Sequence, residues 1–235
     1  MTAITPGDKP NELTVFEHGF VRLDSAMADD LSVVNSARVS FAVRKEDMDD
    51  KDKGLIRFLM RDRHGTPFEH NSFRFHIRTP IFVAREWFRH RIGSFNEESA
   101  RYHKLADDFY VPEPEAVRGQ VGKPGAYTFE QVDESLAHET IDTLRRVYKE
   151  LYAEYQNLIE RGVAKELARA VLPFGIFTQF YWTINARALM NFISLRNSEF
   201  AQYEIRVYAD AVEQLFAQQM PITHECFVEF GRKGP

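Results

Sequence analysis

The chain has 235 residues, of which 44% are hydrophobic and 28% charged, with a formal net charge of −5, as expected of a single globular domain over 1–235. No apolar run is long enough to cross a bilayer and the N-terminus does not resemble a signal peptide, so a cytoplasmic protein without membrane contact is expected. The acidic balance argues against non-specific nucleic-acid binding, and the single Cys226 excludes a disulfide framework or a multi-cysteine metal site.

Strand and helix patterns alternate in the first part of the chain. Phe73, Phe75 and Ile77 alternate with charged side chains, which is typical of a strand with one buried face. Thr79–Pro80 offers an N-cap followed by proline, a favourable helix start. In chain order we expect a strand at 13–23, helices at 29–37 and 49–63, a strand at 68–78 and a helix from 80 to about 90, with Gly65 and Gly93 ending the second and third helices.

Helices dominate the predicted second half. The stretch 113–125 is rich in proline and glycine and is expected to be a loop. A capping box at Thr128 and Gln131 begins a long helix to about Arg161, which stops at Gly162. Further helices are expected at 163–171, 178–196 and 201–220. Strands and short helices followed by long helices indicate an α+β fold, with a mixed sheet and several long helices.

Residues 85–102 gather cationic and flexible side chains in an otherwise acidic protein. Arg85, Arg89, Arg91 and Arg101 lie here with His90, among glycine, serine and asparagine. Guanidinium groups bind phosphate oxygens through paired hydrogen bonds, and serine hydroxyls and free amides complete such sites. The segment therefore indicates a compact site for a nucleotide or a cofactor phosphate. The same arginines could instead form surface ion pairs with neighbouring glutamates, and composition alone leaves both interpretations open.

The order of residues in this segment resembles the signature of the flavin-dependent thymidylate synthases. That signature runs Arg-His-Arg, two variable residues, Ser, one variable, Asn-Glu, one variable, Ser, one variable, Arg-Tyr. Its fixed positions are met by Arg89, His90, Arg91, Ser94, Asn96, Glu97, Ser99, Arg101 and Tyr102. The resemblance extends from 37–41 to 185–196 and implies the fold of the thymidylate synthase-complementing family. It also implies reductive methylation of dUMP to dTMP with FAD as cofactor, NADPH and 5,10-methylenetetrahydrofolate as co-substrates, and a homotetramer with active sites at subunit interfaces.

The resemblance implies roles for individual residues. FAD would be held by Thr66, Arg89, His90, Arg91, Glu97, Asn185, Ala186, Arg187 and Asn191, with Ser40 as a weaker candidate. The substrate dUMP would be bound by Glu86, Trp87, Phe88, Arg89, Glu97, Glu98, Ser99, Ala100, Arg101, Arg169 and Arg196. Ser99, Arg101 and Arg169 would hold its 5′-phosphate. Arg196 and His64 would be the catalytic residues, with Arg196 facing the uracil edge, where a fixed cation stabilises negative charge.

The helix expected at 178–196 would present polar residues on two faces. At about 100° per residue, Asn185 and Arg196 share one face, while Arg187 and Asn191 share another. Such a helix would serve two ligands or two subunits, although the same residues could simply face solvent.

Two positions depart from the family pattern. Glu86 stands where glutamine is usual, and its carboxylate would repel the dUMP phosphate unless an arginine neutralises it or it is protonated. Phe200 stands where histidine is expected. Because of Glu86, a family member that has kept flavin binding and lost catalysis is an alternative, while the Phe200 departure is peripheral. Cys226 lies outside every matched motif, so we expect the reaction to proceed without a cysteine nucleophile.

Two other classes of function compete with this interpretation. His64, His70 and His76 recur every six residues, but no metal-binding motif such as HExxH accompanies them, and no metal is expected. Arginine and aromatic residues also suit single-stranded nucleic acid, but the acidic net charge and the clustering of the arginines disfavour it. Flavin absorption bands in the purified protein would separate the enzyme from both.

Overall fold

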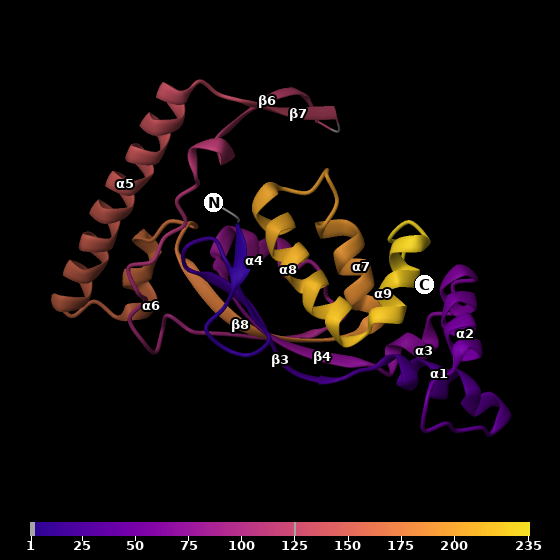
Figure 1. Cartoon of the computed structure of the whole chain (residues 1–235). Coiled ribbons are helices and arrows are strands. Elements are labelled where there is room, and N and C mark those ends of the chain that lie inside the picture. Colours follow the sequence, from indigo (N-terminus) through magenta and orange to yellow (C-terminus); the bar gives the residue numbers. More distant parts are fainter. Residues whose placement is uncertain (1–2, 125) are drawn as a thin grey trace. The chain divides into compact units, whose positions relative to one another are not determined.

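The computed structural model describes residues 3–124 and 126–235, and Figure 1 shows the course of the chain. The chain divides into two compact units. The first comprises residues 3–79, 83–97 and 179–235, and the second comprises residues 80–82 and 98–178. The single domain expected from the sequence stays a prediction. Within the described residues, no helix is both long and apolar enough to span a membrane.

The first unit contains most of a six-stranded sheet, in which the strand order is β1-β2-β3-β4-β8-β5. Its strands are β1 (Ile4–Pro6), β2 (Glu12–Val15), β3 (Gly19–Met27), β4 (Ser72–Pro80), β8 (Phe177–Asn185) and β5 (Ser94–Glu97). The pairs β1–β2, β2–β3, β3–β4 and β5–β8 are antiparallel. The predicted α+β class is confirmed, and the sheet that was expected to be mixed is antiparallel in these pairs.

The alternation predicted for 68–78 places one face of the sheet in the core. Phe73, Phe75 and Ile77 are fully buried. Helices α7 (Ala186–Arg196) and α8 (Tyr203–Gln219) lie side by side, and α9 (Pro221–Glu229) follows them (Figure 1). The Tyr208 hydroxyl of α8 donates to the Arg78 carbonyl at 2.9 Å, which ties this helix to β4.

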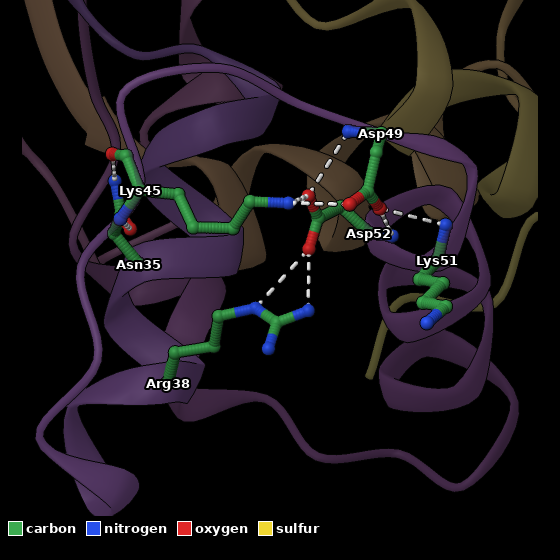
Figure 2. A network of polar contacts seen from close by, with 6 residues as sticks. All are labelled: Asn35, Arg38, Lys45, Asp49, Lys51 and Asp52. Atoms are coloured by element: carbon green, nitrogen blue, oxygen red, sulfur yellow. Dashed lines mark hydrogen bonds and ion pairs between the residues drawn. The ribbon is translucent and has the colours of Figure 1, made fainter.

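A buried carboxylate joins α1 (Asp30–Arg38) to α2 (Asp50–Arg61) near the N-terminus, where η1 (Val39–Phe41) and α3 (Thr66–Glu69) are the other helices. Figure 2 shows Asp52 between Arg38 and Lys45, with one oxygen accepting from Arg38 Nε at 3.1 Å and the other bonded to Lys45 Nζ. The second oxygen also accepts the Asp49 N–H at 3.0 Å, which completes a capping box on α2. These bonds outweigh desolvation and lower the pKa of Asp52 to about 2.

The second unit has its own aromatic core beneath the helix α5 (Glu134–Glu160). Phe109 stacks on Tyr148 with ring centroids 4.7 Å apart, and the Tyr152 hydroxyl donates to the Leu105 carbonyl at 2.8 Å. The other elements of the second unit are η2 (Pro114–Ala116), β6 (Arg118–Lys123), β7 (Ala126–Gln131), α6 (Lys165–Ala168) and η3 (Arg169–Val171). Helix α4 (Ile81–Trp87) begins in the second unit and ends in the first.

Some predicted boundaries were wrong because turns and caps lie inside the predicted segments. The strand expected at 13–23 is the hairpin β2–β3, since Phe16 adopts a left-handed φ of 57° between the two strands. Helix α2 ends at Arg61, where the left-handed Arg63 (φ 61°) redirects the chain, and Gly65 instead precedes α3. The helix expected from 80 to about 90 is the shorter α4, because Pro80 is still the last residue of β4.

Two predicted helices begin later than expected. Residues 118–123 and 126–131 form the hairpin β6–β7 where a loop and the start of a helix were predicted, and Gly125 lies outside the described residues. Helix α5 begins only after Asp133, whose side chain accepts the Leu136 N–H at 2.9 Å. The helix expected at 178–196 is the strand β8 followed by α7, because the Asn185 side chain accepts the Ala188 N–H and caps the helix there.

Candidate active site

A cavity of about 1270 Å³ lies in the first unit, beside the end of α4, the following segment and both ends of α7. Its walls are formed by Arg63, Glu69, Glu86, Arg89, His90, Arg91, Ile92, Ile184, Asn185, Arg187, Ala188, Asn191, Leu195, Arg196, Gly234 and Pro235. Five arginines face two glutamates in this lining, so the cavity carries a positive balance. Its volume and charge suit a large anionic ligand such as a dinucleotide.

The Arg196 guanidinium is fixed on the wall of this cavity. Its Nη1 donates to Glu86 Oε2 at 3.0 Å and its Nη2 donates to the Glu86 carbonyl at 3.2 Å. Its Nε donates to Nε2 of His90 at 3.0 Å. Since Arg196 ends α7 and the other two residues lie in or just after α4, these bonds join segments that are far apart in the chain.

Burial and the Arg196 cation together keep His90 neutral. Burial, followed by the nearby Arg196 charge, lowers the pKa of His90 to about 4. A neutral His90 that accepts at Nε2 must carry its proton on Nδ1, so the ring has one N–H left to donate. Burial also raises the pKa of Glu86, and the charge of Arg196 opposes that rise. The carboxylate of Glu86 is therefore compensated by an arginine. This is one of the two conditions under which it would not repel the dUMP phosphate.

A second arginine, Arg187, is held at the other side of the cavity. It forms an ion pair with Glu69 and its Nε donates to the Pro235 carbonyl at 2.8 Å. Arg63 donates to the neighbouring Gly234 carbonyl at 3.3 Å. Residues 234 and 235 thus form part of the wall. Gly65 packs directly beneath Arg187, where a Cβ would lie 2.5 Å from its Nε.

Other residues predicted to bind a ligand also line the cavity, and most of them form no hydrogen bond or ion pair through their side chains within the described residues. Within residues 3–124 and 126–235, no hydrogen bond or ion pair engages the side chains of Arg89, Arg91 or Asn191, all three of which line the cavity and are exposed. Asn185 lines it as well, with its side-chain oxygen used in the helix cap. The two helix faces predicted to serve different ligands therefore contribute to one cavity.

Several predicted residues do not line this cavity. Trp87 and Ala186 are fully buried, so their side chains are unavailable to a ligand, and Phe88 packs edge-to-face on Phe95 and Phe180. His64 is exposed and its ring lies 5.4 Å from that of Phe58. Three other residues predicted to bind FAD, Ser40, Thr66 and Glu97, are exposed on η1, α3 and β5.

The predicted phosphate residues Ser99, Arg101 and Arg169 all belong to the second unit. The Arg101 Nε and the Ser99 hydroxyl are 3.4 Å apart, and Lys165 donates to the Tyr102 carbonyl at 3.2 Å. This bond brings the start of α6 to the loop that carries Ser99, and Arg169 follows one helical turn later. Glu98 lies 3.2 Å from His103, and Ala100 is almost fully buried, so only its backbone can meet a ligand.

Sequence reasoning missed some of the cavity wall. Arg63, Glu69, Ile92, Ile184, Ala188, Leu195, Gly234 and Pro235 line the cavity and were not assigned a role. Arg63 and Glu69 flank the predicted His64 and Thr66, and Ile92 lies inside the signature segment, so the sequence carried an indirect signal for these three. In the described part of the chain, no group of three or more histidine, cysteine, aspartate or glutamate residues is placed to hold a metal ion.

Comparisons with known proteins identify the family of the chain. The family described as thymidylate synthase complementing protein matches residues 22–222. A flavin-dependent thymidylate synthase of Thermosipho africanus is 46% identical over 223 residues, covering 95% of this chain and 96% of the relative, and that of Thermotoga neapolitana is also 46% identical, covering 95% and 97%. A crystal structure of the UMP/dUMP methylase PolB from Streptomyces cacaoi with 5-Br UMP has a TM-score of 0.85 and 43% identity, covering 92% of this chain and 96% of that one.

Proposed function

Because the chain belongs to the family of the flavin-dependent thymidylate synthases, we propose that it methylates dUMP to dTMP. The observation that carries the proposal is the arginine-rich cavity of about 1270 Å³, in which Glu86 and His90 fix Arg196. FAD is the cofactor, and NADPH and 5,10-methylenetetrahydrofolate are the co-substrates. A homotetramer and a cytoplasmic location stay predictions.

The lining of the cavity fits an FAD molecule. Arg89, Arg91 and Arg187 would meet its diphosphate, since guanidinium groups bind such oxygens in pairs. Asn185 and Asn191 add amide groups to the same wall, and we propose that Thr66, His90, Glu97 and the Ala186 backbone complete the binding set. Bound flavin, reduced by NADPH, supplies the hydride, while the folate supplies the carbon.

The substrate residues would act by positioning and by charge. Ser99, Arg101 and Arg169 of the second unit are proposed to hold the 5′-phosphate, with Glu98 and the Ala100 backbone beside them. Arg196 would place a fixed cation at the uracil edge, where negative charge develops. Glu86, Trp87, Phe88, Arg89 and Glu97 are kept as proposed substrate neighbours, with Trp87 contributing through its backbone because its ring is buried. His64 is proposed as a second catalytic residue beside the flavin.

The proposed reaction uses no cysteine nucleophile. Cys226 is buried in α9, and desolvation raises the pKa of its thiol to about 11. A thiol with such a pKa carries almost no thiolate at neutral pH. Cys226 is also absent from the lining of the cavity. Both observations support a reaction in which no enzyme thiol attacks the uracil ring.

The proposal is tested by assaying dTMP formation with dUMP, methylenetetrahydrofolate, FAD and NADPH. UMP should be tried as a second substrate, because the solved relative is described as a UMP/dUMP methylase. Arg196→Ala should retain flavin, seen in its absorption spectrum, and lose dTMP formation. The matched control is Arg145→Ala, since Arg145 is an exposed arginine on α5. Normal dTMP formation by Arg196→Ala, or none by the unsubstituted protein, would refute the proposal.

A further inference from the structure

The bonds of Arg196 leave a defined part of its guanidinium for a ligand. A guanidinium has five N–H donors. Three of them go to Glu86 Oε2, the Glu86 carbonyl and His90 Nε2. The other two, one on each terminal nitrogen, have no partner among the described residues, while Arg196 itself lines the cavity. The protein therefore fixes the plane of the guanidinium and leaves two donors for acceptors on a bound molecule.

Glu86 provides two of the three acceptors. Its backbone carbonyl is positioned by α4, so the side-chain oxygen at 3.0 Å is the acceptor that a substitution can remove. The Arg196 and Glu86 side chains are 22% and 26% exposed, so the pair is shielded from solvent on most sides. Without it, only the Glu86 carbonyl and His90 Nε2 would hold the guanidinium, and Arg196 would leave this orientation more easily.

The charge of Glu86 has the opposite effect on an anionic ligand. A carboxylate at 3.0 Å compensates the Arg196 cation and so weakens the attraction of the site for a phosphate or an ionised base. Charge and orientation thus act in opposite directions, and different substitutions separate them. Glutamine removes the charge and keeps an acceptor oxygen, whereas alanine removes both.

We propose that Glu86 is a positioning residue that acts through Arg196, its carboxylate holding the guanidinium so that the two remaining N–H groups face the bound nucleotide. This inference rests on the proposed function, since it takes dUMP as that nucleotide. It assigns Glu86 a role that does not require direct contact with substrate.

The test compares the dUMP dissociation constants of Glu86→Gln and Glu86→Ala in the FAD-loaded protein by equilibrium dialysis with radiolabelled dUMP. Both variants have lost the same charge, so any difference between them reports the lost acceptor. Glu86→Ala should bind dUMP about tenfold more weakly than Glu86→Gln, the order expected when a charge-assisted hydrogen bond to the ligand is lost. Glu86→Gln should bind dUMP more tightly than the unsubstituted protein. Urea unfolding and flavin content serve as controls for folding.

The same pair of substitutions in the Arg196→Ala background tests whether Glu86 acts through Arg196. There the two double variants should bind dUMP with the same affinity, because the arginine to be positioned is absent. Equal affinities of the two single variants, or a tenfold difference that persists without Arg196, would overturn the inference alone. A protein that fails to bind dUMP at all would refute the proposed function and this inference with it. Dialysis requires no turnover, so these outcomes are distinguishable from a failure of dTMP formation.

Discussion

Replacing the buried Asp52 by asparagine tests the polar network that holds α1, α2 and the segment between them (Figure 2). The carboxylate has no exposed surface and accepts bonds from Arg38, Lys45 and the Asp49 N–H. An asparagine retains one acceptor oxygen, but its amide N–H groups would face the donors of Arg38 or Lys45. The substitution therefore removes two ion pairs and leaves donors without acceptors.

The lowered pKa gives the size of the effect. The pKa of Asp52 falls from 3.8 to about 2 on folding, a difference of about 1.8 that corresponds to at most about 2.5 kcal/mol of stability at neutral pH. Arg38 and Lys45 are 28% and 24% exposed, so solvent screening reduces this contribution to about 1–2 kcal/mol. Unsatisfied donors add about 1 kcal/mol. We expect Asp52→Asn to lower the free energy of unfolding by about 2–3 kcal/mol.

The measurement is urea unfolding followed by circular dichroism at pH 7 and pH 3. A carboxylate whose pKa is lowered by folding stabilises the protein above the unfolded-state pKa, and this stability is lost as the pH falls through the folded-state pKa. The gap between the unsubstituted protein and Asp52→Asn should therefore be full at pH 7 and lose about half of its ionic part at pH 3. The control is Asp50→Asn in the same helical turn, whose side chain is fully exposed. A gap that does not change with pH, or one no larger than that of Asp50→Asn, would refute the reasoning.

Three further substitutions test the core, the cavity and the thiol. Gly19→Ala should destabilise the protein by about 1–3 kcal/mol in urea, because a Cβ there would lie 1.9 Å from the Tyr208 hydroxyl oxygen; an unchanged midpoint would contradict this packing. Gly65→Ala should displace the Arg187 side chain and weaken FAD binding about threefold to tenfold at nearly unchanged stability, and equal FAD affinity by fluorescence titration would disprove the contact. Cys226→Ala should keep dTMP formation while losing about 1 kcal/mol of stability, and a flavin-loaded variant without turnover would show that the thiol is needed.

The sequence predicted best those elements whose signals are local. The helix starts expected at 29 and 49 coincide with the capping residues Asp29 and Asp49 of α1 and α2, and Gly162, with a φ of 89°, ends α5 as expected. The single helix expected at 178–196 was wrong because no glycine or proline in this stretch marks the boundary between the strand and the helix. Only the Asn185 cap and the neighbouring strands of the sheet separate β8 from α7.

The sequence indicated which residues would face a ligand but not how they are arranged. Signature residues such as Arg89 and Arg91 line the cavity together with Arg196, as the resemblance implied. The two bonds from Arg196 to Glu86 depend on how α7 packs beside α4, which no local pattern encodes. The wall formed by Gly234 was missed for the same reason, since a glycine near the end of the chain carries no signal of its own.

The place of β5 at the edge of the sheet bears on how this protein could be changed by selection. Backbone pairing with β8 holds Ser94–Glu97 in register, and the half-buried Phe95 provides the packing against Trp182 and Phe180. The side chains of Ser94, Asn96 and Glu97 are exposed. Randomising Ser94 and Asn96 would therefore vary the chemistry of the signature segment while keeping the pairing of β5 with β8. A library built there would sample new ligand preferences without first having to compensate for lost stability.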